Sequence, residues 1–185
     1  MSMPTWSSLA SRRLKNPQPG SNLRIAIVGI GYELGGDDAA GPVVAQSLLE
    51  LVGDSPLPDL LVIDAGVAPE NFTGVIRRFR AEMVVLVDAA QMNEMPGTIA
   101  WLDWRETSGM TAATHGLPPY ILAQYLTSEL ACEVCLIGIQ PSSNQFGSQM
   151  SEEVTQAVRE VSQTLAKLVI IPDNDPDSSD QPMEV

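Results

Sequence analysis

The fold is decided by one stretch of the sequence, Gly29-Ile-Gly31-Tyr-Glu-Leu-Gly35-Gly36-Asp37-Asp38-Ala-Ala-Gly41-Pro42. An apolar run at 23–28 leads into this stretch, and an amphipathic pattern at 39–51 leads out of it. A strand, a glycine-rich turn and a helix in this order usually bind phosphate on the N–H groups of the helix. Here the turn ends in two carboxylates, which would repel an anion. The stretch therefore predicts a site for a metal ion, or for a substrate that carries one.

Further apolar runs of strand length alternate with helical patterns along the rest of the chain. The runs lie at 60–63, 83–87 and 133–139, and the helical patterns at 69–80, 118–131 and 152–168. Apolar runs without alternation are typical of central strands that are covered on both faces. A shorter run at 98–102 is compatible with an antiparallel strand at one edge. The pattern predicts a three-layer α/β domain with a mostly parallel sheet.

Carboxylates follow three successive strands of this predicted sheet. Asp37 and Asp38 follow the first strand, Asp64 ends the second, and Asp88 ends the third. Because ligands bind beyond the carboxyl ends of parallel strands, these acids indicate the site. We assign Asp37 a cap or turn role and Asp38 the role that faces the ligand. Unless they are separated or compensated, carboxylates crowded on one rim raise one another's pKa or recruit a cation.

The other candidate site residues have simpler structural roles as alternatives. His115, the only histidine, lies in Thr114-His115-Gly116-Leu117-Pro118. Together with two carboxylates, its imidazole would make a site suited to nickel or zinc. Asp64 is either a turn former before Gly66 or an anionic contact for a basic side chain of a peptide. Cys132 and Cys135 have no second cysteine pair to complete a zinc site, and we interpret them as packing residues.

Composition narrows the classes of partner and sets the domain boundaries. The chain has 185 residues, 44% of them hydrophobic, and a formal charge of −13. That charge argues against nucleic acid or an anionic membrane as a partner. No apolar run approaches the roughly 20 residues of a membrane span, and two cysteines fit a reducing compartment, so we expect a cytoplasmic protein. We also expect it to be a monomer. We expect a disordered basic arm at 1–22, one folded domain at 23–171 and a disordered acidic tail at 172–185.

Five blocks of the sequence, taken in order, resemble the [NiFe]-hydrogenase maturation endopeptidases. The similarity covers about 23–168 and is greatest to the branch that serves formate-hydrogenlyase-type large subunits. The blocks are Gly29-Ile-Gly31 through Gly36-Asp37-Asp38-Ala-Ala-Gly41-Pro42, Asp64-Ala-Gly66-Val-Ala-Pro-Glu70-Asn71, Val87-Asp88-Ala89, Thr114-His115-Gly116-Leu117-Pro118 and Leu136-Ile-Gly138-Ile139-Gln140-Pro141.

The resemblance implies a doubly wound sheet and a defined activity. That activity is removal of the C-terminal extension of a hydrogenase large-subunit precursor after nickel insertion. The resemblance assigns nickel binding to Asp38, Asp88 and His115, with the two aspartates as candidate catalytic residues, and substrate contact to Asp64 and Gly66. The resemblance also implies that the nickel is carried by the substrate and acts as a recognition element, so we expect the free enzyme not to bind it stably.

Several questions stay open at this stage. Family members commonly have Asn where this chain has Tyr32, so support for the first loop must come from elsewhere. Either nickel polarises the scissile carbonyl or a water, with Asp38 or Asp88 as base, or the aspartates do the acid–base work and nickel serves recognition alone.

One alternative function is a non-catalytic nickel-binding maturation chaperone. Another is a nucleotide-dependent α/β enzyme, although the third glycine falls one residue late for a dinucleotide fingerprint.

Overall fold

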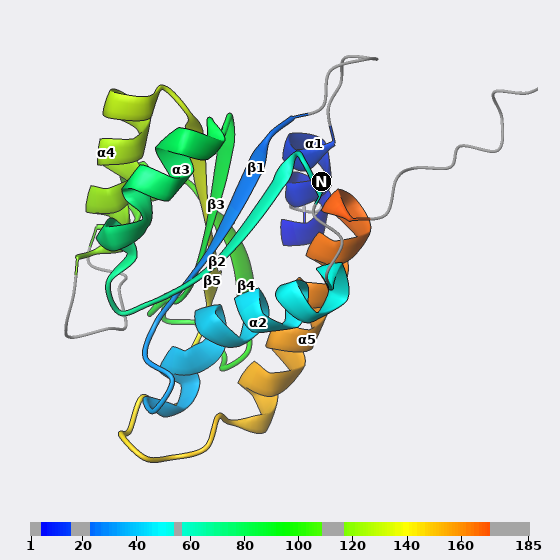
Figure 1. Cartoon of the computed structure of the whole chain (residues 1–185). Coiled ribbons are helices and arrows are strands. Elements are labelled where there is room, and N and C mark those ends of the chain that lie inside the picture. The colour runs from blue at the N-terminus through cyan, green and yellow to red at the C-terminus, as the bar shows by residue number, and fades with distance from the viewer. Residues whose placement is uncertain (1–4, 16–22, 54–56, 109–116, 171–185) are drawn as a thin grey trace, which may run out of the picture.

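The computed structural model describes residues 5–15, 23–53, 57–108 and 117–170. Within these residues, one five-stranded sheet has the order β2-β1-β3-β5-β4 (Figure 1). Its strands are β1 (Ile25–Ile30), β2 (Leu60–Gly66), β3 (Met83–Ala89), β4 (Ile99–Leu102) and β5 (Glu133–Ile139). The first three and β5 pair in parallel, and β4 runs antiparallel to β5 at one edge. The predicted sheet, including its antiparallel edge strand, is confirmed.

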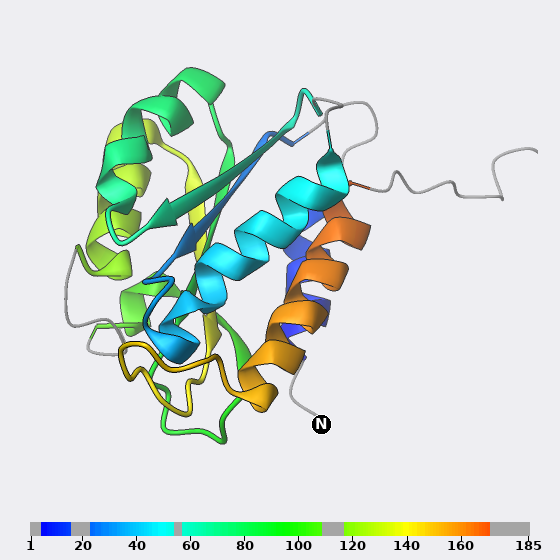
Figure 2. The ribbon, with the colours of Figure 1, turned by 60° about the horizontal axis from the view of Figure 1, so that its bottom comes forward.

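Helices cover both faces of the sheet. The helices α1 (Trp6–Leu14), α2 (Ala40–Val52) and α5 (Glu152–Val169) pack on one face, and α3 (Thr73–Phe79) and α4 (Pro119–Leu130) on the other (Figures 1 and 2). Short 3₁₀ helices, η1 (Gly36–Ala39), η2 (Pro69–Phe72) and η3 (Trp104–Glu106), precede α2, precede α3 and follow β4. The strand order reverses at β1, which makes this the doubly wound arrangement that the resemblance implies.

The buried strands supply both cores because their side chains alternate between the two faces. Every residue of β3 is buried. Val85 and Val87 join the core under α2 and α5, whereas Val84 and Leu86 join the core under α3 and α4. This use of both faces explains why the strands read as continuous apolar runs rather than as alternating patterns.

The expectation of a disordered arm at 1–22 is wrong for residues 6–14, which form α1. Trp6, Ala10 and Leu14 recur every four residues, so one side of the helix is apolar and packs in the core with α5. The Trp6 indole also donates to Glu160 Oε1 at 2.8 Å. The serines and arginines between these three positions made the segment look like a solvated extension. The rest of the arm, and the tail at 172–185, lie outside the described residues.

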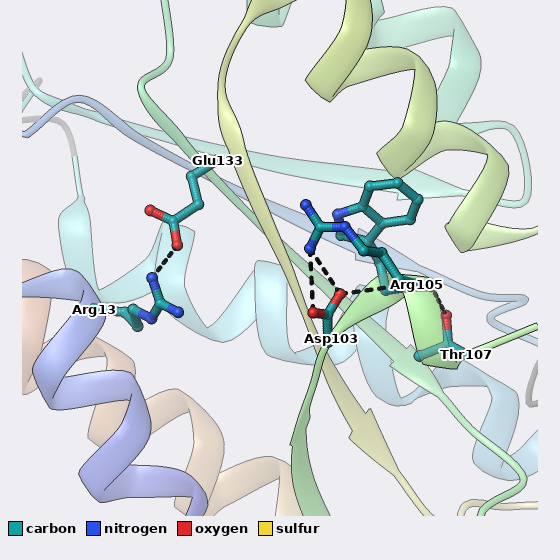
Figure 3. Close-up of polar contacts among 6 residues, drawn as sticks. Arg13, Asp103, Arg105, Thr107 and Glu133 are labelled. Atoms are coloured by element: carbon teal, nitrogen blue, oxygen red, sulfur yellow. Dashed lines mark hydrogen bonds and ion pairs between the residues drawn. The ribbon is translucent and has the colours of Figure 1, made fainter.

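Polar contacts join α1 to the start of β5 and stabilise η3 locally (Figure 3). Arg13 of α1 forms an ion pair with Glu133 at the start of β5. Asp103 accepts from the backbone N–H of Arg105 at 3.0 Å and so caps η3. The Arg105 guanidinium lies over the ring of Trp104, with 4.8 Å between Cζ and the ring centroid. No helix of the described residues is long and apolar enough to cross a membrane.

Candidate functional site

Two glycines of the opening motif allow α2 to begin directly against the sheet. A Cβ on Gly29 would lie 2.2 Å from the carbonyl oxygen of Gly41, and a Cβ on Gly41 would lie 2.3 Å from the carbonyl oxygen of Val87. Gly31 has a φ of 143°, and a Cβ there would lie 1.9 Å from the carbonyl oxygen of Asp38. Only glycine fits at such approaches. The motif therefore holds η1, with its two aspartates, against the carboxyl ends of β1 and β3.

Asp37 is fully buried and accepts four hydrogen bonds from the segment before α5. Its Oδ2 accepts from the N–H groups of Ser142 at 2.7 Å and Ser143 at 2.9 Å, and from the Ser151 hydroxyl at 3.0 Å. Its Oδ1 accepts from the Ser151 N–H at 2.6 Å. Asp37 is thus a structural residue, as we expected. However, it ties down a loop more than 100 residues away and does not cap its own helix, since neither η1 nor α2 has a side-chain cap.

Asp38 and Asp88 form a buried carboxylate pair at the carboxyl end of the sheet. Asp38 Oδ2 accepts from the N–H of Tyr32 at 2.9 Å, but its Oδ1 has no hydrogen-bond partner. Asp88 is 1% exposed, and its Oδ1 also lacks a partner. An unsatisfied buried polar atom is uncommon in native proteins and is typical of functional sites. The two free oxygens are the strongest sign in the described residues of a site that receives a cation or a substrate.

The electrostatics of this pair follow from its burial. Burial raises the pKa of the Asp88 carboxyl well above its usual range, the nearby charge of Asp38 raises it further, and the N–H of Ala89 lowers it in part. Burial also raises the pKa of Asp38, while the hydrogen bond from Tyr32 lowers it. The structure therefore places these two carboxyls within electrostatic reach of each other. Their catalytic and metal-binding roles stay predictions.

His115, the third predicted metal ligand, lies outside the described residues. Leu117, two positions later, packs with the core under α3 and α4. Asp88 alternates with Leu86, which belongs to that same core, so its side chain leaves the sheet on this face. Among the described residues, no group of three or more His, Cys, Asp and Glu side chains gathers as a metal site. Of the three predicted metal ligands, the described residues therefore include two, Asp38 and Asp88.

Asp64 does not join the Asp38–Asp88 pair. It pairs in register with Gly29, and Gly29 pairs with Val87, so Asp64 falls one residue out of phase with Asp88 and points to the α2 face. There its Oδ2 accepts from Gln46 Nε2 at 2.8 Å, and its Oδ1 accepts from the Gly66 N–H at 3.2 Å. The carbonyl of Gly66 in turn accepts from the N–H of Gly31 at 3.0 Å. Both residues support the first loop, and their predicted contact with substrate stays a prediction.

Support for the loop at Tyr32 comes from the loop before α5. The ring of Tyr32 stacks on Phe146, with centroids 6.0 Å apart and an interplanar angle of 19°. The N–H of Gly147 donates to the carbonyl of Leu34 at 2.8 Å. Together with the hydrogen bonds of Asp37, these contacts join the loop after β1 to the loop after β5. They answer the question that the absence of Asn at position 32 left open.

Gln140 is a buried residue of the site that sequence reasoning did not single out. Its Oε1 accepts from the N–H groups of Met92 at 2.7 Å and Glu94 at 3.3 Å. Its Nε2 donates to Gln91 Oε1 at 3.1 Å. Gln140 therefore shapes the loop that follows Asp88. The available signal was an uncharged polar residue directly after a strand that is apolar from Val134 onward, within a block already quoted for the resemblance.

The two cysteines are buried free thiols, which agrees with the packing role that we assigned to them. Burial raises the pKa of both thiols. Cys132 Sγ donates to the carbonyl of Leu126 at 3.3 Å, and Cys135 lies in the core under α2 and α5. A buried thiol with a raised pKa is a poor nucleophile, so neither cysteine is a candidate for the chemistry.

Comparison with known proteins agrees with this fold. A sequence profile described as hydrogenase maturation protease, HycI, matches residues 44–168. The hydrogenase 3 maturation protease of Escherichia coli strain K12 is 35% identical over 137 residues, covering 74% of this chain and 85% of that protein. The profile match includes Asp64, Asp88 and His115, and it begins after Asp38.

Solved structures extend the likeness to three dimensions. The crystal structure of the [NiFe] hydrogenase maturation protease HycI from Thermococcus kodakarensis KOD1 has a TM-score of 0.72 and 35% identity, covering 80% of this chain and 93% of that one. The solution structure of an endopeptidase, HycI from Escherichia coli, has a TM-score of 0.67 and 32% identity, covering 76% of this chain and 88% of that one. With the doubly wound sheet and the motif-held aspartates, these matches mean that the chain belongs to the hydrogenase maturation protease family.

Proposed function

We propose that this chain is the endopeptidase that removes the C-terminal extension of a [NiFe]-hydrogenase large-subunit precursor after nickel has been inserted. The proposal combines the family with one observation in the structure. Asp38 and Asp88 bury two carboxyl oxygens without hydrogen-bond partners at the end of the sheet where ligands bind. Each such oxygen costs about 1–3 kcal/mol when unsatisfied, so the presence of two in one place supports a role in binding.

The donor set suits nickel that arrives bound to the substrate. Carboxylate oxygens and an imidazole are acceptable ligands for Ni²⁺, and a site with few protein ligands leaves positions for those that the precursor supplies. In this proposal, Asp38 and Asp88 provide the two oxygens and His115 provides the nitrogen. The precursor is then bound productively only when it carries the metal, which makes nickel the recognition element.

Two mechanisms of cleavage are compatible with this site. In the first, the nickel of the substrate polarises the scissile carbonyl or a water, and an aspartate takes up the proton. In the second, the two carboxyls perform the acid–base steps as a coupled pair, and nickel serves only recognition. In both routes Asp38 is held in place by the Tyr32 N–H, and the fold keeps Asp88 away from bulk water.

A processing assay tests the proposal. Purified protein is mixed with a large-subunit precursor, with and without nickel loaded, and the C-terminus of the precursor is followed by intact mass. We expect loss of the extension from the nickel-loaded precursor alone, and no processing by the Asp88→Asn and His115→Ala variants. Wild-type protein that is folded, binds nickel tightly and cleaves neither form would instead favour the maturation chaperone.

A further inference from the structure

The described loops at the end of the sheet that carries the carboxylate pair contain acidic residues and no Lys or Arg. We define the rim loops as residues 31–39, 67–72, 90–98 and 140–151, which follow β1, β2, β3 and β5 (Figure 2). None of the residues in these loops, all of which the structure describes, is Lys or Arg. The acids in the rim loops are Glu33, Asp37, Asp38, Glu70 and Glu94. A partner that approaches this end therefore meets a negative potential, which favours a basic surface.

The same loops expose most of the large apolar side chains that the described part of the chain leaves uncovered. Of eight such residues, five lie in the rim loops. They are Tyr32, Leu34, Val67, Met95 and Phe146. Leu34 is 55% exposed and Phe146 is 70% exposed. Scattered apolar residues need no explanation, but several gathered around a buried pair of carboxyls indicate an interaction surface.

Three of these exposed residues lie on two loops that are joined to each other beside Asp38. We call Tyr32, Leu34 and Phe146 the aromatic patch. Tyr32 stacks on Phe146, and the backbone of Leu34 is bonded to Gly147. The N–H of Tyr32 donates to Asp38 Oδ2 at 2.9 Å. The patch is therefore connected to Asp38, the candidate catalytic residue, through the backbone of the loop that carries Tyr32.

We propose that the aromatic patch docks the large-subunit precursor next to the bond to be cleaved, by receiving an apolar segment flanked by Lys or Arg residues. This inference rests on the proposed function, because it takes the precursor as the partner. Two carboxylates and a metal offer few contacts for holding a protein, whereas aromatic anchors in a polar rim supply most of the energy in protein interfaces. The flanking basic residues of the precursor lie against Glu33, Glu70 and Glu94.

Charge argues for the precursor as the occupant over a second copy of this chain. Two copies that met through the aromatic patch would bring their rim loops together, and with them acids of like sign. Juxtaposed like charges disfavour such a complex. The basic residues among those described lie elsewhere, for example Arg24, Arg77 and Arg80, which line a cavity of about 580 Å³ beside the starts of β1 and β3.

The chain offers a matched control for this surface. Leu51, near the C-terminal end of α2, is 57% exposed, against 55% for Leu34. It lies at the opposite end of α2 from η1 and so away from the rim loops. Leu34→Ala and Leu51→Ala therefore remove the same side chain at nearly the same exposure. Phe146→Ala is the third variant, and thermal melting of all three confirms that they fold.

The test measures steady-state processing of the nickel-loaded precursor by each variant. We expect Leu34→Ala and Phe146→Ala to raise KM about tenfold, the usual scale for an anchoring side chain at an interface, with a much smaller effect on kcat. Leu51→Ala should match the wild type. The wild-type KM should rise with added salt, because rim charges are screened.

The possible outcomes distinguish failure of the docking surface from failure of the proposed function. Wild-type cleavage with equal KM values for all variants would overturn the docking surface and leave the proposed function intact. A wild-type dimer that Phe146→Ala converts to monomers would assign the patch to self-association and also overturn the docking surface. Absence of wild-type cleavage would remove the proposed function, and this inference with it.

Discussion

Replacing Asp37 by Asn tests whether one buried carboxylate holds two distant loops in place. The two oxygens of Asp37 accept from three N–H groups and one hydroxyl. An Asn keeps one acceptor oxygen, and at the position of Oδ2 it can still serve Ser142 and Ser143. Its NH₂ group then faces the N–H of Ser151, which now lies 2.6 Å from Oδ1. Two hydrogen-bond donors would then face each other in a buried position, with no acceptor between them.

The expected cost follows from these contacts. A hydrogen bond to a charged group contributes about 1.5–3 kcal/mol, and bonds to a neutral acceptor contribute about half as much. Loss of the Ser151 bond and weakening of the others give a destabilisation of about 3 kcal/mol. For a chain of this size, that lowers Tm by roughly 6–12 °C. The charge removed does not offset this loss, because four donors already compensate the buried carboxylate.

Two measurements check the Asp37 prediction. Thermal unfolding gives the change in Tm, and hydrogen exchange reports whether the amides of Ser142, Ser143 and Ser151 lose protection. Ser151→Ala, which removes a cap hydroxyl but leaves the backbone donors, should cost only about 1 kcal/mol. If Asp37→Asn melted within about 2 °C of the wild type, less than 1 kcal/mol for this size, the four hydrogen bonds would not hold the loops and our reasoning would be refuted.

The other predictions concern Asp88, Gly41 and Cys132. Because the folded pKa of Asp88 is raised above 3.8, its stabilising contribution is present at low pH and is lost as pH rises through the folded pKa. Asp88→Asn should therefore melt higher than the wild type at pH 7 and equally near pH 4; an advantage that shrinks with rising pH would contradict this. Gly41→Ala should destabilise by about 2–3 kcal/mol or more in denaturant unfolding, because its Cβ would press on backbone of β1 and β3. Cys132→Ala should process precursor at the wild-type rate, and loss of activity at unchanged stability would assign this thiol a functional role.

Local patterns in the sequence were enough to predict most of the fold. Each strand appeared as an apolar run because both faces of the sheet are covered, and the antiparallel edge strand at Ile99–Leu102 was recognisable after its Pro96-Gly97 turn. Each buried element is marked in the sequence by its own pattern of apolar residues. The helix α1 was not predicted because it is short, with only three buried positions, and lies within a polar segment.

The sequence indicated candidate residues for the site but not which of their side chains the fold brings together. Acids after three strands indicated one rim, and the structure indeed brings Asp38 and Asp88 together. The pleat turns Asp64 to the other face, where Gln46 binds it. A prediction from strand ends alone has an uncertainty of one residue, and one residue reverses the direction of a side chain in a strand.

By itself, the sequence determined the alternation of strands and helices, the glycines that let η1 approach the sheet, and the family. These features depend on neighbours in the chain or on a short motif, so their signals are local. Only the tertiary structure decided that Asp37 ties down the loop 105–114 residues away, that Tyr32 stacks on Phe146, and that two carboxyl oxygens stay unpaired. Such contacts arise when distant segments are brought together by burial of the two cores, and no local pattern records which segments will meet.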